Sequence, residues 1–234
     1  MTTEIPVITV DGPSGTGKGT LCGYLARMLG WHLLDSGALY RVVAHAAAET
    51  GTGLDDGAAL ARIAAGLDVS FREIGGQIHA YLGQDLRDIT AAIRTESCGN
   101  AASRVAACEP VRHALLERQR AFLRLPGLIA DGRDMGTVIF PRAPLKIYLT
   151  ADPEERAGRR YKQLNEKGIS VNLQRLSAEI RERDARDAGR KISPLKPAPD
   201  AIVIDTTSLD INAVCQRVAG EVRNSFPDYP ADAQ

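Results

Sequence analysis

Residues 7–20 read VITVDGPSGTGKGT, and this stretch decides the fold. Residues 7–10 are mostly apolar and β-branched, as expected of a short buried strand. A glycine-rich turn follows, and apolar side chains then recur with the spacing of one helix face, at Leu21, Tyr24, Leu25, Met28 and Leu29. A strand, a glycine loop with a lysine and then a helix is the pattern of a phosphate-binding P-loop.

The residue types in this loop suit a polyphosphate. Glycines let backbone N–H groups converge on an anion, the helix start adds partial positive charge, and Lys18 supplies a full charge. A glycine-rich turn with a solvated lysine is the alternative, but it leaves the spacing and the two flanking elements unexplained. The predicted nucleotide-binding residues are Gly12, Pro13, Ser14, Gly15, Thr16, Gly17, Lys18, Gly19 and Thr20.

The position after the lysine departs from the usual P-loop. A Ser or Thr hydroxyl commonly stands there as a Mg²⁺ ligand. Here Gly19 fills that position, and the next hydroxyl belongs to Thr20. The sequence therefore predicts no direct protein ligand for Mg²⁺ at position 19.

Composition excludes several classes of protein. The 234 residues suffice for one large domain, and the 29 basic and 29 acidic residues argue against a general nucleic-acid or membrane-surface binder. The four cysteines show no CxxC pairing, so we expect core residues rather than a zinc site or a disulfide framework. With no membrane-length apolar run and no signal-peptide pattern, the sequence predicts a soluble cytoplasmic protein.

Apolar runs predict the other strands of a parallel sheet, at residues 31–35, 128–131, 145–149 and 201–205. A different pattern lies between the first two of these runs. There the two segments 67–71 and 78–82 alternate apolar and polar residues around Gly75-Gly76, which predicts an antiparallel hairpin in an inserted subdomain. We expect helices over 38–49 (with Ser36 as its N-cap), 55–65, 89–107, 153 onward, 173–190 and 209–222, and one opening at Glu109-Pro110.

Charged residues gather where a ligand is expected. Polar clusters follow three predicted strands, at 11–18, 35–41 and 131–134, and open α/β sheets bind ligands at the carboxyl ends of their strands. Arg41 lies in the first turn of its predicted helix, and Arg156, Arg159 and Arg160 lie in the early turns of another. A positive charge near a helix start opposes the helix dipole unless an anion is near. Solvated or salt-bridged surface arginines remain the alternative.

One face of the predicted helix 173–190 changes from apolar to charged. Leu173, Leu176 and Ile180 are continued on that face by Arg183, Asp187 and Arg190. In one interpretation the helix leaves the core and reaches over a binding site. In the other it ends in a solvated face with i,i+4 ion pairs.

These features indicate a small phosphotransferase. The chain lacks the guanine-reading Asn/Thr-Lys-x-Asp motif of GTPases, and transport ATPases are normally longer. If the acceptor is itself a phosphate, its second pKa near ~6 leaves an ionised oxygen at pH 7, so no general base is needed. Catalysis then consists of positioning and charge neutralisation, for which the chain offers Arg41, Arg112, Arg133, Arg156, Arg159, Arg183 and Arg190.

Four separated segments resemble, in order, the bacterial cytidylate kinases, a family of nucleoside monophosphate kinases. They are GPSGTGKGT at 12–20, LLDSGALYR at 33–41, IADGRDMG at 129–136 and ERDARD at 182–187. The likeness extends to about residue 222, with further matches at 100–103 and 110–112. Glycine after the P-loop lysine is normal in that family, so Gly19 fits it.

The resemblance implies transfer of the γ-phosphoryl group of ATP to cytidine or deoxycytidine monophosphate (CMP or dCMP), with Mg²⁺ held largely by phosphates and water. It also implies an α/β fold in which a five-stranded parallel P-loop kinase core carries an inserted monophosphate-binding subdomain at 36–107 and a helical lid at 152–190. The whole of 1–234 then forms one domain. We expect a monomer, with no nucleic-acid or membrane partner.

The resemblance also assigns residues by position. Lys18, Arg133 and Arg190 are implied as catalytic, and Thr20 and Asp131 as the nearest groups to Mg²⁺ or its water. Arg156 and Arg159 are predicted as further ATP ligands from their positive charge near a helix start. Within the acceptor site, Ser103, Arg183 and Asp187 are implied to read the cytosine. The Asp187 carboxylate can accept a hydrogen bond from the N4 amine of cytosine, whereas uracil presents O4, which is itself an acceptor. The implied acceptor-site residues are Ser36, Tyr40, Arg41, Ser103, Arg112, Arg133, Asp134, Arg183, Asp187 and Arg190.

Two other functions remain open at this point. A kinase for another monophosphate, such as uridylate or adenylate, is the nearer one, although the insert around 67–86 and the Arg183–Asp187 pair favour cytosine. A nucleotide-binding module without turnover, such as a sensor, is the other. Lys18 together with the arginine set favours an enzyme.

Overall fold

A computed structural model describes residues 5–74 and 77–227 of the chain. The chain forms two compact units. The first unit contains the residues up to Leu34 and those from Phe122 on, and the second is Asp35–Ala121. The P-loop and the segments around 133 and 187 therefore belong to one unit, and the antiparallel insert belongs to the other.

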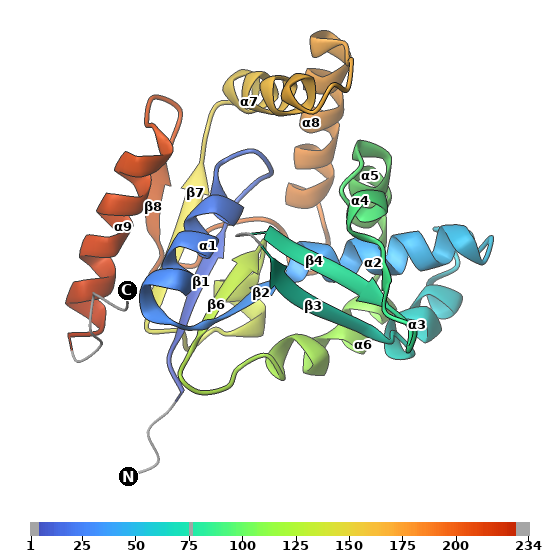
Figure 1. Cartoon of the computed structure of the whole chain (residues 1–234), viewed down its shortest axis with the longest axis horizontal. Helices are drawn as coiled ribbons and strands as arrows, with labels where there is room; N and C mark the ends of the chain where they lie inside the picture. The colour runs from blue at the N-terminus through green and yellow to red at the C-terminus, as the bar shows by residue number, and fades with distance from the viewer. Residues whose placement is uncertain (1–4, 75–76, 228–234) are drawn as a thin grey trace. The chain divides into compact units, whose positions relative to one another are not determined.

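The first unit is built on a five-stranded parallel sheet with the strand order β2-β6-β1-β7-β8 (Figure 1). Strand β1 (Val7–Asp11), which leads into the P-loop, is buried throughout and pairs with β6 (Leu128–Gly132) and β7 (Leu145–Thr150). Strands β2 (His32–Asp35) and β8 (Ile202–Asp205) lie at the edges. The predicted α/β class with a five-stranded parallel sheet is confirmed.

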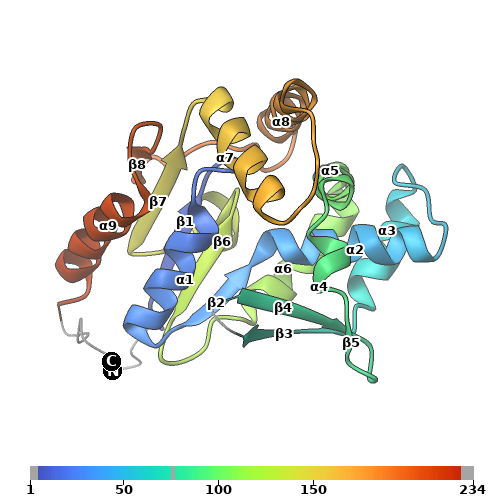
Figure 2. The same cartoon turned by 45° about the horizontal axis from the view of Figure 1, so that its top comes forward.

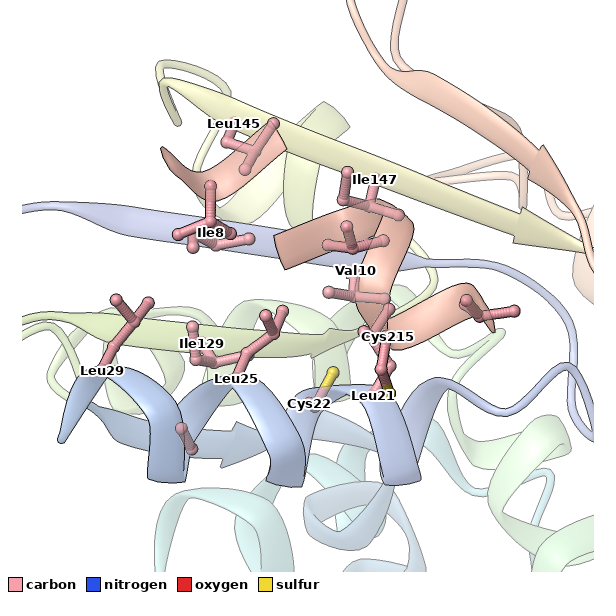
Figure 3. Close-up of a cluster of buried hydrophobic side chains, with 14 of the residues drawn as sticks. Ile8, Val10, Leu21, Cys22, Leu25, Leu29, Ile129, Leu145, Ile147 and Cys215 are labelled. Carbon is pink, nitrogen blue, oxygen red and sulfur yellow. The ribbon is translucent and has the colours of Figure 1, made fainter. Parts of the chain in front are cut away.

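Helices α1 (Lys18–Leu29) and α9 (Ile211–Ser225) pack against the sheet and complete its main core. Figure 3 shows Leu21 and Leu25 of α1 directed toward strand residues such as Ile147. The apolar spacing predicted for α1 is confirmed, because its apolar side chains are buried or pack against this core. Cys22 and Cys215 are buried as predicted, whereas Cys98 and Cys108 are half-buried, and none of the four forms a disulfide within the described residues.

The predicted lid segment contains helices α7 (Pro153–Glu166) and α8 (Leu173–Ala188), which lie side by side (Figure 2). The α7 start is as predicted, since Asp152 accepts the Glu154 N–H at 2.8 Å and proline takes the first helical position. Helix α8 ends two residues earlier than predicted, so Arg190 lies just beyond it. A small core joins the two helices through Ala157, Leu164, Leu176 and Ile180.

The described residues of the second unit form five helices and a small antiparallel sheet of order β3-β4-β5. The predicted hairpin is confirmed, with Val69 paired to Leu82, while its Gly75-Gly76 turn lies outside the described residues. Strand β5 was not predicted, because two residues are too few to show a periodicity. The elements are α2 (Ser36–Glu49), α3 (Gly57–Ala65), β3 (Val69–Ile74), β4 (Gln77–Leu82), β5 (Arg87–Asp88), α4 (Thr90–Ile93), α5 (Glu96–Val105) and α6 (Glu109–Arg120).

Two local predictions in this unit are wrong. Asp35, not Ser36, caps α2, since its Oδ1 accepts the Ala38 N–H at 2.9 Å and Ser36 is already helical. The single helix predicted over 89–107 is broken into α4 and α5 at Thr95. Thr95 has extended backbone angles, and its hydroxyl accepts the Cys98 N–H at 3.2 Å to start α5.

Gly12 has no room for a side chain. Its φ is +143°, and a Cβ there would lie 2.0 Å from the Leu149 carbonyl oxygen on β7. We expect Gly12→Ala to destabilise the protein by about 3 kcal/mol or more, which would lower the melting temperature by roughly 6–12 °C. Calorimetry measures the change.

Gly30 provides the matched control for this substitution. It also has a positive φ, +66°, but nothing lies within 4 Å of a Cβ built on it. Gly30→Ala should cost only the left-handed backbone strain, about 1–2 kcal/mol. Equal shifts for the two variants would show that the approach of Gly12 to β7 is not what demands glycine.

Candidate active site

The P-loop closes around its lysine. Lys18 is the first residue of α1, and its Nζ donates to the Pro13 carbonyl at 2.7 Å. The Thr16 hydroxyl donates to the same oxygen at 3.1 Å. Gly15 and Gly17 have φ values of +80° and +91°, which glycine adopts without strain. The ammonium group is thus held within the turn of the loop.

The surroundings of Lys18 make its charge easy to lose. Burial, with a further contribution from the nearby Arg133 guanidinium, lowers the pKa of the ammonium from 10.5 to about 8, against the opposing effect of the Asp131 carboxylate. The three side chains are therefore close enough to interact electrostatically. An anion bound at this place would restore the charge of Lys18.

Asp11 connects the P-loop strand to the segment that carries Arg133. Its two carboxylate oxygens accept the N–H groups of Met135 at 2.9 Å and Gly136 at 2.8 Å. Burial, with smaller contributions from the charges of Asp134 and Asp131, raises the pKa of Asp11 from 3.8 to about 7, although the two N–H donors act in the opposite direction. Such a carboxyl group is costly to ionise, and its two hydrogen bonds give it a positioning role.

The charged end of α8 forms a buried cluster around one carboxylate. Asp187 is 2% exposed and accepts from Arg133 Nε at 3.3 Å and from Arg190. Arg183 Nε lies 4.0 Å from the same carboxylate. Three guanidinium groups thus surround one acid, and within residues 5–74 and 77–227 the Arg190 Nε has no hydrogen-bond acceptor. This cluster has the charge and the unused donor of an anion site.

Arg156 and Arg159 are predicted as ATP ligands, and both lie beside loops that follow strands of the parallel sheet. Arg156 donates to the Ser14 carbonyl at 3.1 Å, and Arg159 donates to the Thr206 carbonyl at 2.5 Å and its hydroxyl at 3.2 Å. Thr206 Oγ1 lies 3.3 Å from the carbonyl oxygen of Thr16 in the P-loop. Each arginine therefore has protein acceptors, and contact with ATP stays a prediction.

Five predicted acceptor-site residues belong to the second unit. Ser36 and Ser103 are buried on α2 and α5, and the Arg112 guanidinium lies over the Tyr40 ring, 5.7 Å from its centroid. Arg41 donates to the carbonyls of Ile93 and Thr95 at 2.6 and 3.0 Å, and burial lowers its pKa. Arg41 is thus anchored to the α4–α5 junction.

The oxygen groups near the P-loop suit a Mg²⁺ ion held mainly by phosphate and water. Asp131 faces the start of α1, since its Oδ2 would lie 3.9 Å from a Cβ placed on Gly19. Thr20 is exposed one residue further along. Within the described ranges 5–74 and 77–227, no three acidic, His or Cys side chains gather as a metal site. One carboxylate beside a phosphate loop fits an ion that keeps its water.

A protein-family profile described as cytidylate kinase matches residues 8–224. The chain belongs to the cytidylate kinase family. A cytidylate kinase of Aeromonas hydrophila is 56% identical over 223 residues, covering 95% of this chain and 96% of its own. One from Serratia proteamaculans is 58% identical, with 93% and 94% covered. Among solved structures, a gluconokinase from Sinorhizobium meliloti aligns with a TM-score of 0.43 at 13% identity over 95% and 98% of the chains, which adds nothing to the assignment.

The predicted site residues are divided between the two units. Lys18, Asp131 and Asp187 with its arginines belong to the first unit, whereas Tyr40, Arg41 and Arg112 belong to the second. Sequence reasoning gave no individual role to five residues that hold site residues in place, although Asp11, Asp35 and Asp184 lie in the polar clusters and matched segments named above. Their roles depend on partners distant in the sequence, which local patterns do not show. The five residues are Asp11, Asp35, Arg94, Asp184 and Thr206.

No helix in the described part of the chain has the length and apolar character needed to cross a membrane.

Proposed function

We propose that this protein transfers the γ-phosphoryl group of ATP to CMP and dCMP. Membership of the cytidylate kinase family supports this activity. The observation that carries the mechanism is that one compact unit contains both a P-loop lysine and a buried arginine cluster with surplus positive charge. We further propose that the enzyme works in the cytoplasm as a monomer on free nucleotides.

The donor side is proposed to be the P-loop. Its backbone N–H groups and Lys18 would bind the β- and γ-phosphates, and charge on the transferring group is what Lys18 would stabilise most. A Mg²⁺ ion bound with the nucleotide would supply charge neutralisation at the transferring group. Asp131, whose carboxylate faces the start of α1, is proposed to hold water of that ion.

The acceptor side is proposed to use the arginine cluster for the phosphate of CMP. Arg133 and Arg190 would neutralise the two phosphates as they approach, while Arg183, Asp187 and Ser103 would contact cytosine. A carboxylate has about four lone-pair sites, so Asp187 can accept from N4 while it keeps its arginines. The acceptor phosphate is ionised at pH 7, and no residue is required as a base.

A coupled assay of ADP release with CMP, dCMP, UMP and AMP tests this function. We expect kcat/KM for CMP and for dCMP to exceed kcat/KM for UMP and for AMP by about a hundredfold or more. Faster turnover of UMP or AMP would identify a different monophosphate kinase. Binding of ATP without turnover on any acceptor would identify a nucleotide-binding module.

ATP binding is expected to weaken as the pH rises through about 8. The free enzyme loses the Lys18 charge there, because burial lowers the pKa of this lysine to about 8. A bound triphosphate would keep the lysine protonated, so binding at pH 8 should take up roughly half a proton. Titration calorimetry in buffers of different ionisation enthalpy measures the uptake, and none at pH 8 would contradict the role of Lys18.

The segment 152–190 is proposed to act as the lid. We expect its amide hydrogen exchange to slow when ATP and CMP are both bound, by more than with either nucleotide alone, because closure excludes water from the transferring group. Exchange in α9 serves as the internal reference. An unchanged rate in 152–190 with both nucleotides present would rule out closure.

A further inference from the structure

Arg156 links three segments of the first unit. It lies in the first turn of α7 and is 2% exposed. Its Nε donates to the Ala151 carbonyl at 3.0 Å, one terminal nitrogen donates to the Ser14 carbonyl at 3.1 Å, and the other donates to Asp184 at 2.5 Å. The end of β7, the P-loop and α8 are thereby joined through one guanidinium group.

The contact with the P-loop is close as well as polar. A Cβ built on Gly15 would lie 3.0 Å from the Cβ of Arg156, so the loop backbone rests directly on this side chain. Displacement of Arg156 would therefore change the contacts of the loop at two residues, Ser14 and Gly15.

Asp184 places the other end of the link on the acceptor-binding helix. It precedes Asp187 by three residues, and residues three apart share one side of a helix. It also directly follows Arg183. Its Oδ1 is buried with no hydrogen-bond partner in the described part of the chain, so the bond to Arg156 is the one that this carboxylate makes with a described side chain. This bond connects the charged part of α8 to the start of α7.

We propose that the Arg156–Asp184 pair is a positioning clamp, which holds the P-loop and the charged end of α8 in one fixed arrangement. This inference rests on the proposed function, because it assumes the donor in the loop and the acceptor at α8. Phosphoryl transfer depends on aligning two anions, and a displacement of about 1 Å can cost ~100-fold in rate. Arg156 thus acts through Ser14 and Asp184, rather than as the ATP ligand that the sequence predicts.

The test compares Asp184→Asn, Arg156→Met and the double variant in steady-state kinetics and in binding of each nucleotide alone. Loss of the clamp should raise the KM of both ATP and CMP by about fivefold and lower kcat by about tenfold. The double variant should be within about twofold of the worse single variant, since both changes break one link. A loss of stability alone would lower the melting temperature without moving both KM values.

The surface pair Glu154–Arg181 supplies the matched control. It joins the same two helices, but both side chains are more than half exposed, and neither is bonded to the P-loop among the described contacts. Glu154→Gln should change each kinetic constant by less than about twofold.

Two results would overturn the clamp. One is an Arg156→Met variant that raises only the KM of ATP while Asp184→Asn resembles wild type, because Arg156 would then be an ATP ligand. The other is fully multiplicative effects in the double variant. Failure of the proposed function would show instead as wild-type enzyme inactive on CMP. In that case amide exchange decides, since Asp184→Asn should accelerate exchange at 12–18 and 183–188 together by about tenfold, and unchanged exchange there would reject the clamp.

Discussion

Lys18→Ala is expected to lower kcat by about a thousandfold or more while the fold stays intact. The ammonium group is held inside the P-loop turn, where its charge would act on the transferring phosphoryl group. A thousandfold loss corresponds to about 4 kcal/mol of transition-state stabilisation. Burying a charged lysine whose pKa is lowered to about 8 costs free energy below that pH, so its removal should not lower the melting temperature at pH 7. Coupled ADP-release kinetics and calorimetry measure the two effects.

Lys146 is the matched control, because it is the other deeply buried lysine of the same unit. Its Nζ donates to the Pro141 carbonyl at 2.7 Å and to both carboxylate oxygens of Asp200. Lys146→Ala should therefore show the opposite result, a lower melting temperature with kcat within about threefold of wild type. A Lys18→Ala enzyme with kcat within tenfold of wild type would remove this residue from the transfer step.

Asp187→Asn is expected to lower kcat/KM for CMP by about a hundredfold and to narrow the preference for CMP over UMP. The carboxylate balances the positive charges of Arg133, Arg183 and Arg190, and the neutral amide leaves them uncompensated. The amide also weakens acceptance from the cytosine N4 amine, whereas its own N–H can donate to uracil O4. The ratio of kcat/KM for the two nucleotides measures the change in base reading.

Glu182→Gln tests whether any charge removed from α8 has the same effect. Glu182 is 74% exposed and pairs with Arg186 on the outer side of the helix, so its loss should leave the ratio unchanged. Should Asp187→Asn fail to fold, Asp187→Glu keeps the charge and displaces it by one methylene group. If neither Asp187 variant changes the CMP to UMP ratio, Asp187 does not read the base.

The central part of the fold could be predicted because local pattern and tertiary structure agree there. The apolar run before Gly12 forms the central strand, and the helical spacing after Lys18 forms α1. The hairpin was predictable because its alternation reflects one solvated face. The placement of Lys18 in the loop followed from the motif itself.

The cap of α2 could not be decided from the sequence. Asp35 and Ser36 are both good N-cap residues. The choice falls on Asp35, whose second oxygen also accepts from Arg94 at 3.0 Å. That partner lies 59 residues away, and local spacing carries no information about it.

The positioning roles of Asp11 and Asp184 were not predicted for the same reason. Asp11 is bonded to N–H groups 124 and 125 residues away, and Asp184 to an arginine 28 residues away. Arg156 was predicted as an ATP ligand because its charge opposes the helix dipole. In the structure the charge of Arg156 is paired with the Asp184 carboxylate on α8, and the dipole argument considered only α7.

The central place of β1 in the sheet has a consequence for how the enzyme can move. Because this strand is hydrogen-bonded on both sides, freeing the base of the donor loop would require neighbouring strands to separate, an opening that approaches global unfolding in free energy. The P-loop is therefore anchored to a strand whose local opening is costly. Substrate entry and product exit must depend on helices whose opening is less costly.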